Sequence, residues 1–224
     1  MKYLPKVIAS VLLMFGMSTQ AAVVPYENYL GLGGFVDALT GSPVTHTFEG
    51  IAPPLSYIPY GNASSLPIVP FLVVDGVKFT PNDSAFVLDA GYNGAYSAVT
   101  DVPFFTAQGD PNVLSVTLTT GVTAIGFFYG SYNGESSSFS ASVNSGAFVA
   151  SGLLLPGTTN TTKFIGFTST LPITSIVFTQ AAGANFDVTT FVTGSAAPVP
   201  EPSMALMFGV GLALMGAVAR RKRA

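Results

Sequence analysis

The chain has 224 residues, of which 8% are charged, and its formal net charge at pH 7 is -3. Soluble proteins usually carry about 25% charged residues, so this chain presents few charges for its length. Gly (24) and Pro (16) are frequent and Cys is absent. Without Cys, disulfides, thiol nucleophiles and thiolate metal sites are excluded, so a domain of this length must be held by its apolar core.

The basic residues are concentrated at the two ends of the chain. Six of the eight Lys and Arg residues lie in 1–6 and 220–223. Between Ala22 and Pro200 there are two Lys, no Arg and ten Asp or Glu, which gives this middle part a formal charge near -8 (2 minus 10). Phosphate neutralisation needs a face rich in Lys and Arg, so the middle part argues against nucleic acid as a partner.

The N-terminus predicts a secretory signal peptide over residues 1–21. Two lysines in the first six residues precede an apolar run over 7–17, and small residues follow it up to Ala22. This order is typical of the basic region, apolar region and cleavage site of such peptides. We expect cleavage after Ala21 or Ala22 and export of the remainder, because an apolar run of about eleven residues is short for a membrane anchor.

The C-terminus carries a second segment with three parts. A linker over 195–202 contains Pro200-Glu201-Pro202, an apolar stretch covers 203–219, and a basic tail fills 220–224. As a helix, the stretch would be roughly 25 Å long at ~1.5 Å per residue, which is near the minimum for a bilayer core. The cations of the tail are expected on the cytoplasmic side. They are Arg220, Arg221, Lys222 and Arg223.

This tail resembles the PEP-CTERM sorting signal of Gram-negative bacteria, with Pro200, Glu201 and Pro202 on the namesake tripeptide. The resemblance implies transient anchoring in the inner membrane and recognition by an exosortase, a membrane protease-transpeptidase that removes the helix near the tripeptide. It also implies delivery to the cell surface or the extracellular space, in an organism that makes exopolysaccharide, biofilm or floc. A plain single-span anchor with a Pro-rich stalk explains the same pattern.

The middle part, residues 22–194, predicts an all-β domain, an antiparallel, jelly-roll-like β-sandwich. Short apolar runs recur between turn residues, several of them with alternating polarity. Asp75-Gly76 indicates a two-residue hairpin turn, and residues 23–43 predict a first strand plus a loop. The other expected strands are 44–48, 68–74, 77–79, 85–88, 113–119, 124–130, 138–143, 147–154, 162–167, 173–179 and 186–193.

Nothing in the sequence indicates catalysis, and we expect a non-enzymatic protein without catalytic residues. His46 is the only histidine, so a Ser–His–Asp site would require it. It lies in an alternating strand and is expected to be half-buried with one hydrogen bond. No Gly-x-Ser-x-Gly turn is present. A glycosidase needs two carboxyl groups about 5–10 Å apart, and no pair among the ten acids is singled out.

Calcium is the cofactor that this composition fits best, because it takes oxygen ligands and needs neither His nor Cys. Jelly-roll carbohydrate-binding modules, which the domain resembles at the level of fold, often hold a structural calcium between an early strand and the last one. That resemblance implies Glu49 and Asp187 as candidate ligands, with Asn185. Solvated turn residues are the competing explanation. A second candidate group consists of Asp83, Asp89, Asp101 and Asp110, with Asn82 and Asn112.

Sugar binding would use exposed aromatic side chains, and since Trp is absent the candidates are tyrosines. Tyr57 and Tyr60 are expected in a Pro-rich loop. The ligand-binding candidates near Gly or Asn turns are Tyr92, Tyr96, Tyr129 and Tyr132, and packing at the sandwich edge is their alternative role. Two functional hypotheses follow: a structural or adhesive component of an extracellular matrix, associated with exopolysaccharide or biofilm, and a lectin-like carbohydrate-binding module, with or without calcium.

Overall fold

The computed structural model describes residues 22–61, 69–90, 92, 102–130, 137–146, 148–156, 161–180 and 185–198. The predicted signal peptide, the sorting tripeptide, the apolar stretch and the basic tail lie outside these residues. The described part is almost entirely β-structure, as predicted, with one 3-10 helix, η1 (Val36–Ala38). The strands are β1 (Val23–Tyr26), β2 (Val44–Thr47), β3 (Tyr57–Gly61), β4 (Leu72–Val74), β5 (Val77–Pro81), β6 (Ser84–Leu88), β7 (Phe104–Ala107), β8 (Asn112–Gly130), β9 (Ser138–Val143), β10 (Phe148–Leu154), β11 (Lys163–Gln180) and β12 (Phe186–Gly194).

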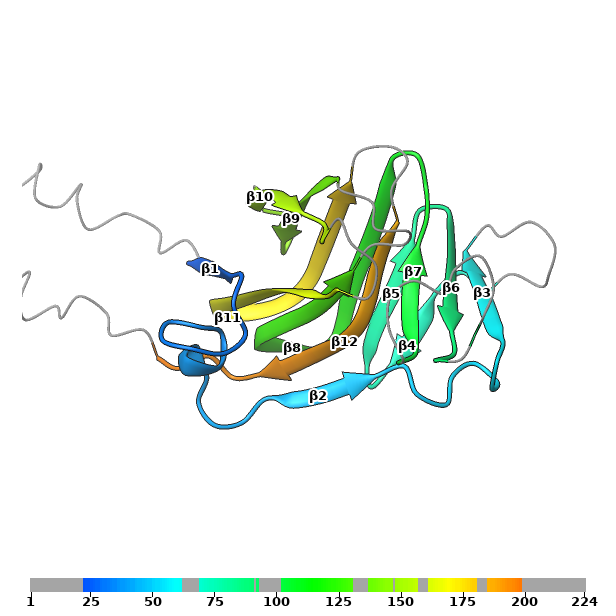
Figure 1. Ribbon diagram of the computed structural model, residues 1–224. Coiled ribbons are helices and arrows are strands. Elements are labelled where there is room, and N and C mark those ends of the chain that lie inside the picture. Colours follow the sequence, from blue (N-terminus) through cyan, green and yellow to red (C-terminus); the bar gives the residue numbers. More distant parts are fainter. Residues whose placement is uncertain are drawn as a thin grey trace, which may run out of the picture.

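All twelve strands belong to one antiparallel sheet (Figure 1). Its main path runs β10-β9-β11-β8-β12-β7-β6-β3; β1 adds to β11, β2 adds to β12, and the β4–β5 hairpin adds to β8. The sequence predicted two strands in each of the regions that form β8 and β11, but each region is one long strand with a register shift near its middle. The shift lies beside Gly121, where a Cβ atom would come within 2.7 Å of Pro172.

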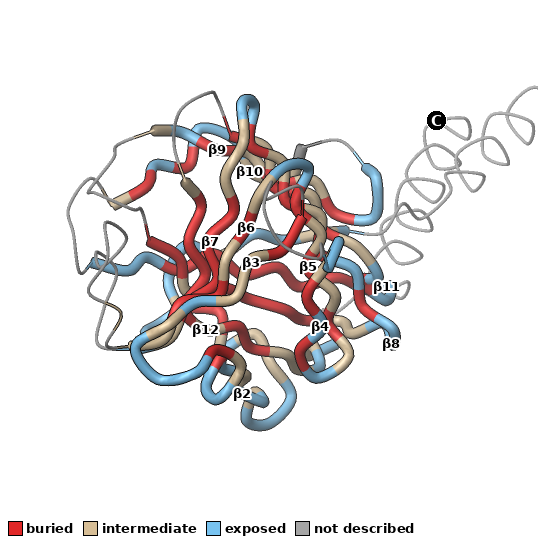
Figure 2. Tube along the Cα trace, turned by 90° about the vertical axis from the view of Figure 1, so that its right-hand side faces the viewer, coloured by how far each residue is buried: buried red, intermediate tan, exposed pale blue. Residues whose placement is uncertain are grey.

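The sheet bends at this shift, so that its two halves face each other across a core of phenylalanines. Phe127, in the second half of β8, lies 5.2 Å from Phe178, in the second half of β11. On the other side of the core, Phe79 of β5 lies 5.4 Å from both Phe105 of β7 and Phe191 of β12. Figure 2 shows the buried residues on the strands and the exposed residues mainly on the turns. The two facing halves correspond to the predicted layers of a sandwich.

A second, smaller apolar cluster covers the outer face of β8, β11 and β12. Phe35, just before η1, is fully buried there against Phe164. Gly126 and Gly166 leave room for these rings: a Cβ atom at Gly166 would lie 2.5 Å from Phe35, and one at Gly126 would clash with Phe164. The segment after β1, predicted as a strand plus loop, therefore packs on the sheet.

Two strands were not predicted. The sequence indicated a Pro-rich loop where β3 forms, but Pro59 is tolerated because β3 is the last strand of the sheet path. β7 has four buried residues in succession and hence no alternating pattern. The predicted strand 68–74 is shorter in the structure, beginning at Leu72.

The chain enters and leaves the domain at one end. Val24 pairs with Thr168, Thr168 with Ala124, and Ala124 with Gly194. Three strand spacings of ~4.8 Å place the first and last strands about 14 Å apart along this row. In Figure 1 this end lies at the left and β3 lies at the right. Within the described ranges, no helix has the length and apolar character needed to cross a bilayer.

Candidate functional site

An aromatic surface lies on the outer side of β3 and β6, at the end of the domain remote from β1 and the end of β12. It consists of Tyr57, Phe86 and Tyr92. The Tyr57 ring is 43% exposed and lies 5.6 Å from Phe86 and 5.4 Å from Tyr92, both in edge-to-face geometry. Tyr92 was a predicted ligand-binding residue, whereas Tyr57 was placed in a loop.

The backbone around this surface is held by the side chain and the backbone of Asp89. Asp89 Oδ2 accepts a hydrogen bond of 2.8 Å from the backbone N–H of Leu55. The backbone N–H of Asp89 donates to Ser56, and that of Tyr92 donates to Asp89. Asp89 thus joins the turn before β3 to the turn after β6, so that Tyr57 and Tyr92 are held side by side. An aromatic group that is already ordered loses less entropy when a ligand stacks on it.

Tyr129 is not part of any such surface, which corrects its prediction as a ligand-binding residue. It is buried in the core, 4.9 Å from Phe139 and 5.7 Å from Phe186. The reason is the period of two along β8, since Ile125, Phe127 and Tyr129 all point inward. Burial raises the pKa of the Tyr129 hydroxyl far above its ordinary value, and the charge of Glu27 adds to this effect. The other two predicted tyrosines, Tyr96 and Tyr132, lie outside the described residues.

The two candidate calcium ligands lie in different environments. β2 and β12 pair as neighbours, so the early and last strands are adjacent, as the resemblance to carbohydrate-binding modules implied. Glu49 is exposed in the turn after β2, whereas Asp187 is fully buried, opposite Thr106 and Gly130 in the sheet. Among the described residues, no three Asp, Glu or His side chains form a group that could hold a metal ion.

In the second predicted calcium group, the two asparagines make hydrogen bonds within the turns. Asn82 accepts a hydrogen bond from the backbone N–H of Val113 at 2.9 Å and donates one to the carbonyl of Pro111 at 2.8 Å. The Asn112 amide donates to the carbonyl of Ala107. These amides hold the turn between β7 and β8. Asp110 lies in this same turn, Asp83 lies in the turn between β5 and β6, and Asp101 lies outside the described residues.

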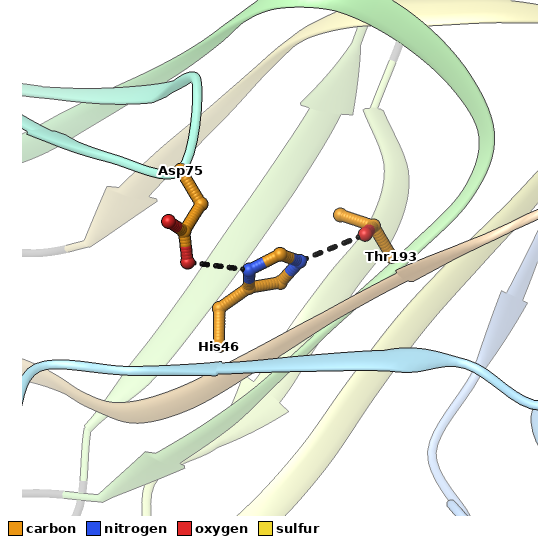
Figure 3. A network of polar contacts seen from close by, with 3 residues as sticks. All are labelled: His46, Asp75 and Thr193. Atoms are coloured by element: carbon orange, nitrogen blue, oxygen red, sulfur yellow. Dashed lines mark hydrogen bonds and ion pairs between the residues drawn. The ribbon is translucent and has the colours of Figure 1, made fainter.

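A polar network centres on His46 (Figure 3). His46 Nδ1 lies 2.8 Å from Asp75 Oδ2, and Nε2 lies 2.9 Å from Thr193 Oγ1. The imidazole ring also stacks on Phe191, with 4.5 Å between the ring centroids. A neutral ring that donates from Nδ1 to the carboxylate accepts the Thr193 hydroxyl at Nε2. His46 was expected to make one hydrogen bond, and it makes two.

The order carboxylate, imidazole, hydroxyl is the same as in a Ser–His–Asp triad, but the environment differs. In such triads the carboxylate that orients the histidine is buried. The Asp75 side chain is 64% exposed. The three residues come from β2, the β4–β5 turn and the end of β12, which belong to both halves of the sheet. The arrangement ties the two halves together at the edge of the core.

Comparisons with known proteins identify one family feature. The PEP-CTERM protein-sorting motif matches residues 198–223. This match begins four residues after the end of β12, and it confirms the resemblance of the tail to that signal. No curated protein matches the chain.

Similarities to solved structures are partial. A CBM32 module of AlyQ in complex with 4,5-unsaturated mannuronic acid has 23% identity and a TM-score of 0.31, over 42% of this chain and 78% of that chain. The catalytic domain of a GH87 alpha-1,3-glucanase variant in complex with tetrasaccharides has 12% identity and a TM-score of 0.34. That match covers 74% of this chain and 31% of the glucanase chain.

Proposed function

We propose that this chain, an exported protein that carries a PEP-CTERM protein-sorting motif, is a non-enzymatic structural or adhesive component of the extracellular matrix. An exosortase processes the tail near Pro200-Glu201-Pro202, and the domain remains at the cell surface or in the surrounding exopolysaccharide. The observation that supports this proposal most directly is that β1 and the end of β12, where the chain enters and leaves the domain, lie at one end of it. The sheet edge at β3 is then directed away from the membrane.

The test is the phenotype of cells that lack the protein. Deletion of its coding sequence is expected to reduce the mass or cohesion of the extracellular matrix, and the intact chain should restore it. A chain with Glu201→Ala and Pro202→Ala should accumulate unprocessed in the membrane fraction. Unchanged matrix together with normal export of the protein would contradict the matrix role while leaving the sorting role intact.

The second candidate function is lectin-like binding of exopolysaccharide at the aromatic surface. It is favoured by the exposed Tyr57 ring, which Tyr92 and Phe86 hold in place at the end remote from the tail. Aromatic rings offer an apolar face to sugar rings, and the neighbouring backbone offers hydrogen-bonding groups. A glycan array, run with and without a chelator, tests this function. Signals that a chelator removes would support calcium assistance, and no signal under either condition would exclude the lectin hypothesis.

A further inference from the structure

The loop between β1 and η1 exposes two leucines beside the point where the chain leaves the domain. We propose that this loop, residues 28–35, docks on the lipid bilayer while the sorting tail still anchors the protein. The inference rests on the membrane-anchored tail of the proposed function, and adds a second contact between the domain and the membrane. The binding partner of the loop is the interfacial layer of the lipid bilayer, and the contact requires no protein.

The loop is closed by its own backbone and by two aromatic anchors. The N–H of Phe35 donates to the carbonyl of Asn28 at 2.9 Å, and the N–H of Gly34 donates to Gly31 at 2.8 Å. Gly31 and Gly33 have φ values of 99° and 76°, in the left-handed region that favours glycine. The rings of Tyr29 and Phe35 pack against Phe164 on the sheet.

With the anchors packed, the leucines at the tip face solvent. The Leu30 side chain is 69% exposed, and Leu32 is completely exposed. No charged residue occurs between Asn28 and Phe35. An uncharged loop with two outward leucines gains free energy by moving these side chains from water into the apolar part of an interface.

Hydrogen bonds place this loop next to the tail. The backbone N–H of Gly33 donates to Asp37 Oδ2 at 3.1 Å, and Asp37 lies in η1. Its neighbour Ala38 accepts a hydrogen bond of 2.8 Å from the N–H of Ala197, just before the PEP-CTERM motif begins. In Figure 1 the loop lies at the left, at the same end as the segment that follows β12.

The spacing along the chain keeps this end of the domain near the bilayer. From Ala197 to the start of the predicted membrane stretch at Ser203 there are six residue steps, which at ~3.6 Å each span at most about 22 Å. The interfacial layer occupies roughly 5–8 Å on each side of the hydrocarbon core. An apolar loop held beside Ala197 can therefore reach the interface before the tail is cut.

Because the chain has no Cys, single-cysteine labelling tests the proposal directly. The chain without its signal peptide is reconstituted in phosphatidylcholine vesicles with a polarity-sensitive fluorophore at Leu30→Cys or Leu32→Cys. The matched control is Leu55→Cys, a leucine of 71% exposure in the turn before β3, at the opposite end. A fourth variant, Leu212→Cys, reports insertion of the tail itself.

We expect the two loop labels to shift their emission to the blue and to lose intensity when brominated phosphatidylcholine is present, with no such change at residue 55. If residue 212 is quenched while the loop labels behave as residue 55 does, the docking proposal is overturned and the anchored tail stands. If residue 212 is not quenched, the membrane anchor and the docking both fail. Protection of the loop labels only in membranes that contain an exosortase would assign the loop to a protein and overturn the lipid assignment.

Discussion

His46 and Asp75 join the two halves of the sheet through a contact of 2.8 Å between Nδ1 and Oδ2. Asp75 occupies the β4–β5 turn with φ of 47°, and the neighbouring Gly76 accepts hydrogen bonds from the backbone and hydroxyl of Thr119. The turn is thus bound to β8 on one side and to β2 on the other. Among the described strands, β2 pairs only with β12 and is therefore an edge strand. The contact between His46 and Asp75 adds a second attachment for β2, to the β4–β5 turn.

His46→Phe should destabilise the domain moderately. Phenylalanine preserves the stacking on Phe191, but the contacts to Asp75 and Thr193 are lost, at about 0.5–1.5 kcal/mol for each hydrogen bond. We expect a decrease of about 1–2 kcal/mol in the free energy of unfolding, measured by urea denaturation. Asp75→Asn, which keeps a residue tolerant of positive φ, should cost less than about 1 kcal/mol because the carboxylate is largely exposed.

A double-mutant cycle of His46→Phe and Asp75→Gly separates the pair from its surroundings, because glycine tolerates the positive φ at residue 75 and leaves Nδ1 of His46 without its acceptor. If the two effects are strictly additive, the 2.8 Å contact between His46 and Asp75 contributes nothing to stability.

The hairpin turn at Asp75 could be predicted from the sequence, whereas the contact of Asp75 with His46 could not. Asp75-Gly76 has the local chemistry of a two-residue turn, and His46 lies in a strand with clear alternation. Their contact depends on β2 lying beside β12, which is a pairing between segments about 145 residues apart in the chain. No local pattern encodes such a pairing.

The tyrosines also show which features a local sequence pattern can predict and which it cannot. Tyr129 could have been assigned to the core from its spacing with Phe127 and Ile125. Tyr57 could not have been assigned to this surface, because Pro59 makes the sequence of β3 look unlike a strand. In addition, the position of Tyr92 beside Tyr57 depends on the hydrogen bonds of Asp89. The sequence identifies strands by periodicity, while the composition of a surface follows from which strands become neighbours.

Gly166→Ala should destabilise the domain because the added Cβ atom would lie 2.5 Å from the Phe35 ring. Overpacking of this kind typically costs about 1–3 kcal/mol. Gly194→Ala is the matched control, since its Cβ atom would meet Leu39 at an ordinary 3.4 Å. Thermal unfolding followed by circular dichroism should show a lower Tm for the first variant and a nearly unchanged Tm for the second. Equal Tm values for both variants would contradict the packing of Phe35 on the sheet.

Stability should fall at alkaline pH because Tyr129 is buried. A tyrosine is neutral when protonated, and burial raises the pKa of the folded-state hydroxyl above the unfolded value near 10. The contribution is therefore fully present below about pH 10 and is lost as the pH rises, at about 1.4 kcal/mol per pH unit for one proton. Burial raises the pKa of Tyr60 as well, so this residue acts in the same direction.

Urea denaturation between about pH 8 and 11.5 measures this loss. Tyr129→Phe should unfold with a shallower dependence on pH, while its stability at pH 8 stays close to that of the original chain because the hydroxyl makes only a contact of 3.5 Å with Leu154. An identical pH dependence in the variant would show that the Tyr129 hydroxyl reaches water in the folded state.

Asn144→Ala should loosen the bend of β11. Asn144 Oδ1 accepts hydrogen bonds from the backbone N–H groups of Thr174 and Ser175, and its amide donates to the carbonyl of Pro172. Removal of these bonds is expected to cost about 1–3 kcal/mol and to increase hydrogen exchange at the backbone amides of residues 173–175. Asn144→Asp keeps the acceptor and should retain most of the protection. Unchanged exchange in the alanine variant would show that the bend is held by the core alone.

If the aromatic surface binds polysaccharide, Tyr57→Ala should lower the affinity for polysaccharide and Tyr57→Phe should leave it nearly unchanged. Phenylalanine keeps the ring that contacts Phe86 and Tyr92, so affinity should be nearly preserved. Alanine removes the exposed face, and a loss of about 1.4 kcal/mol would weaken binding about tenfold. Leu171→Ala, at an exposed leucine in the bend of β11, is the control. Affinity electrophoresis in gels containing the purified exopolysaccharide measures the effect, and equal retardation of all three variants would place any binding elsewhere on the domain.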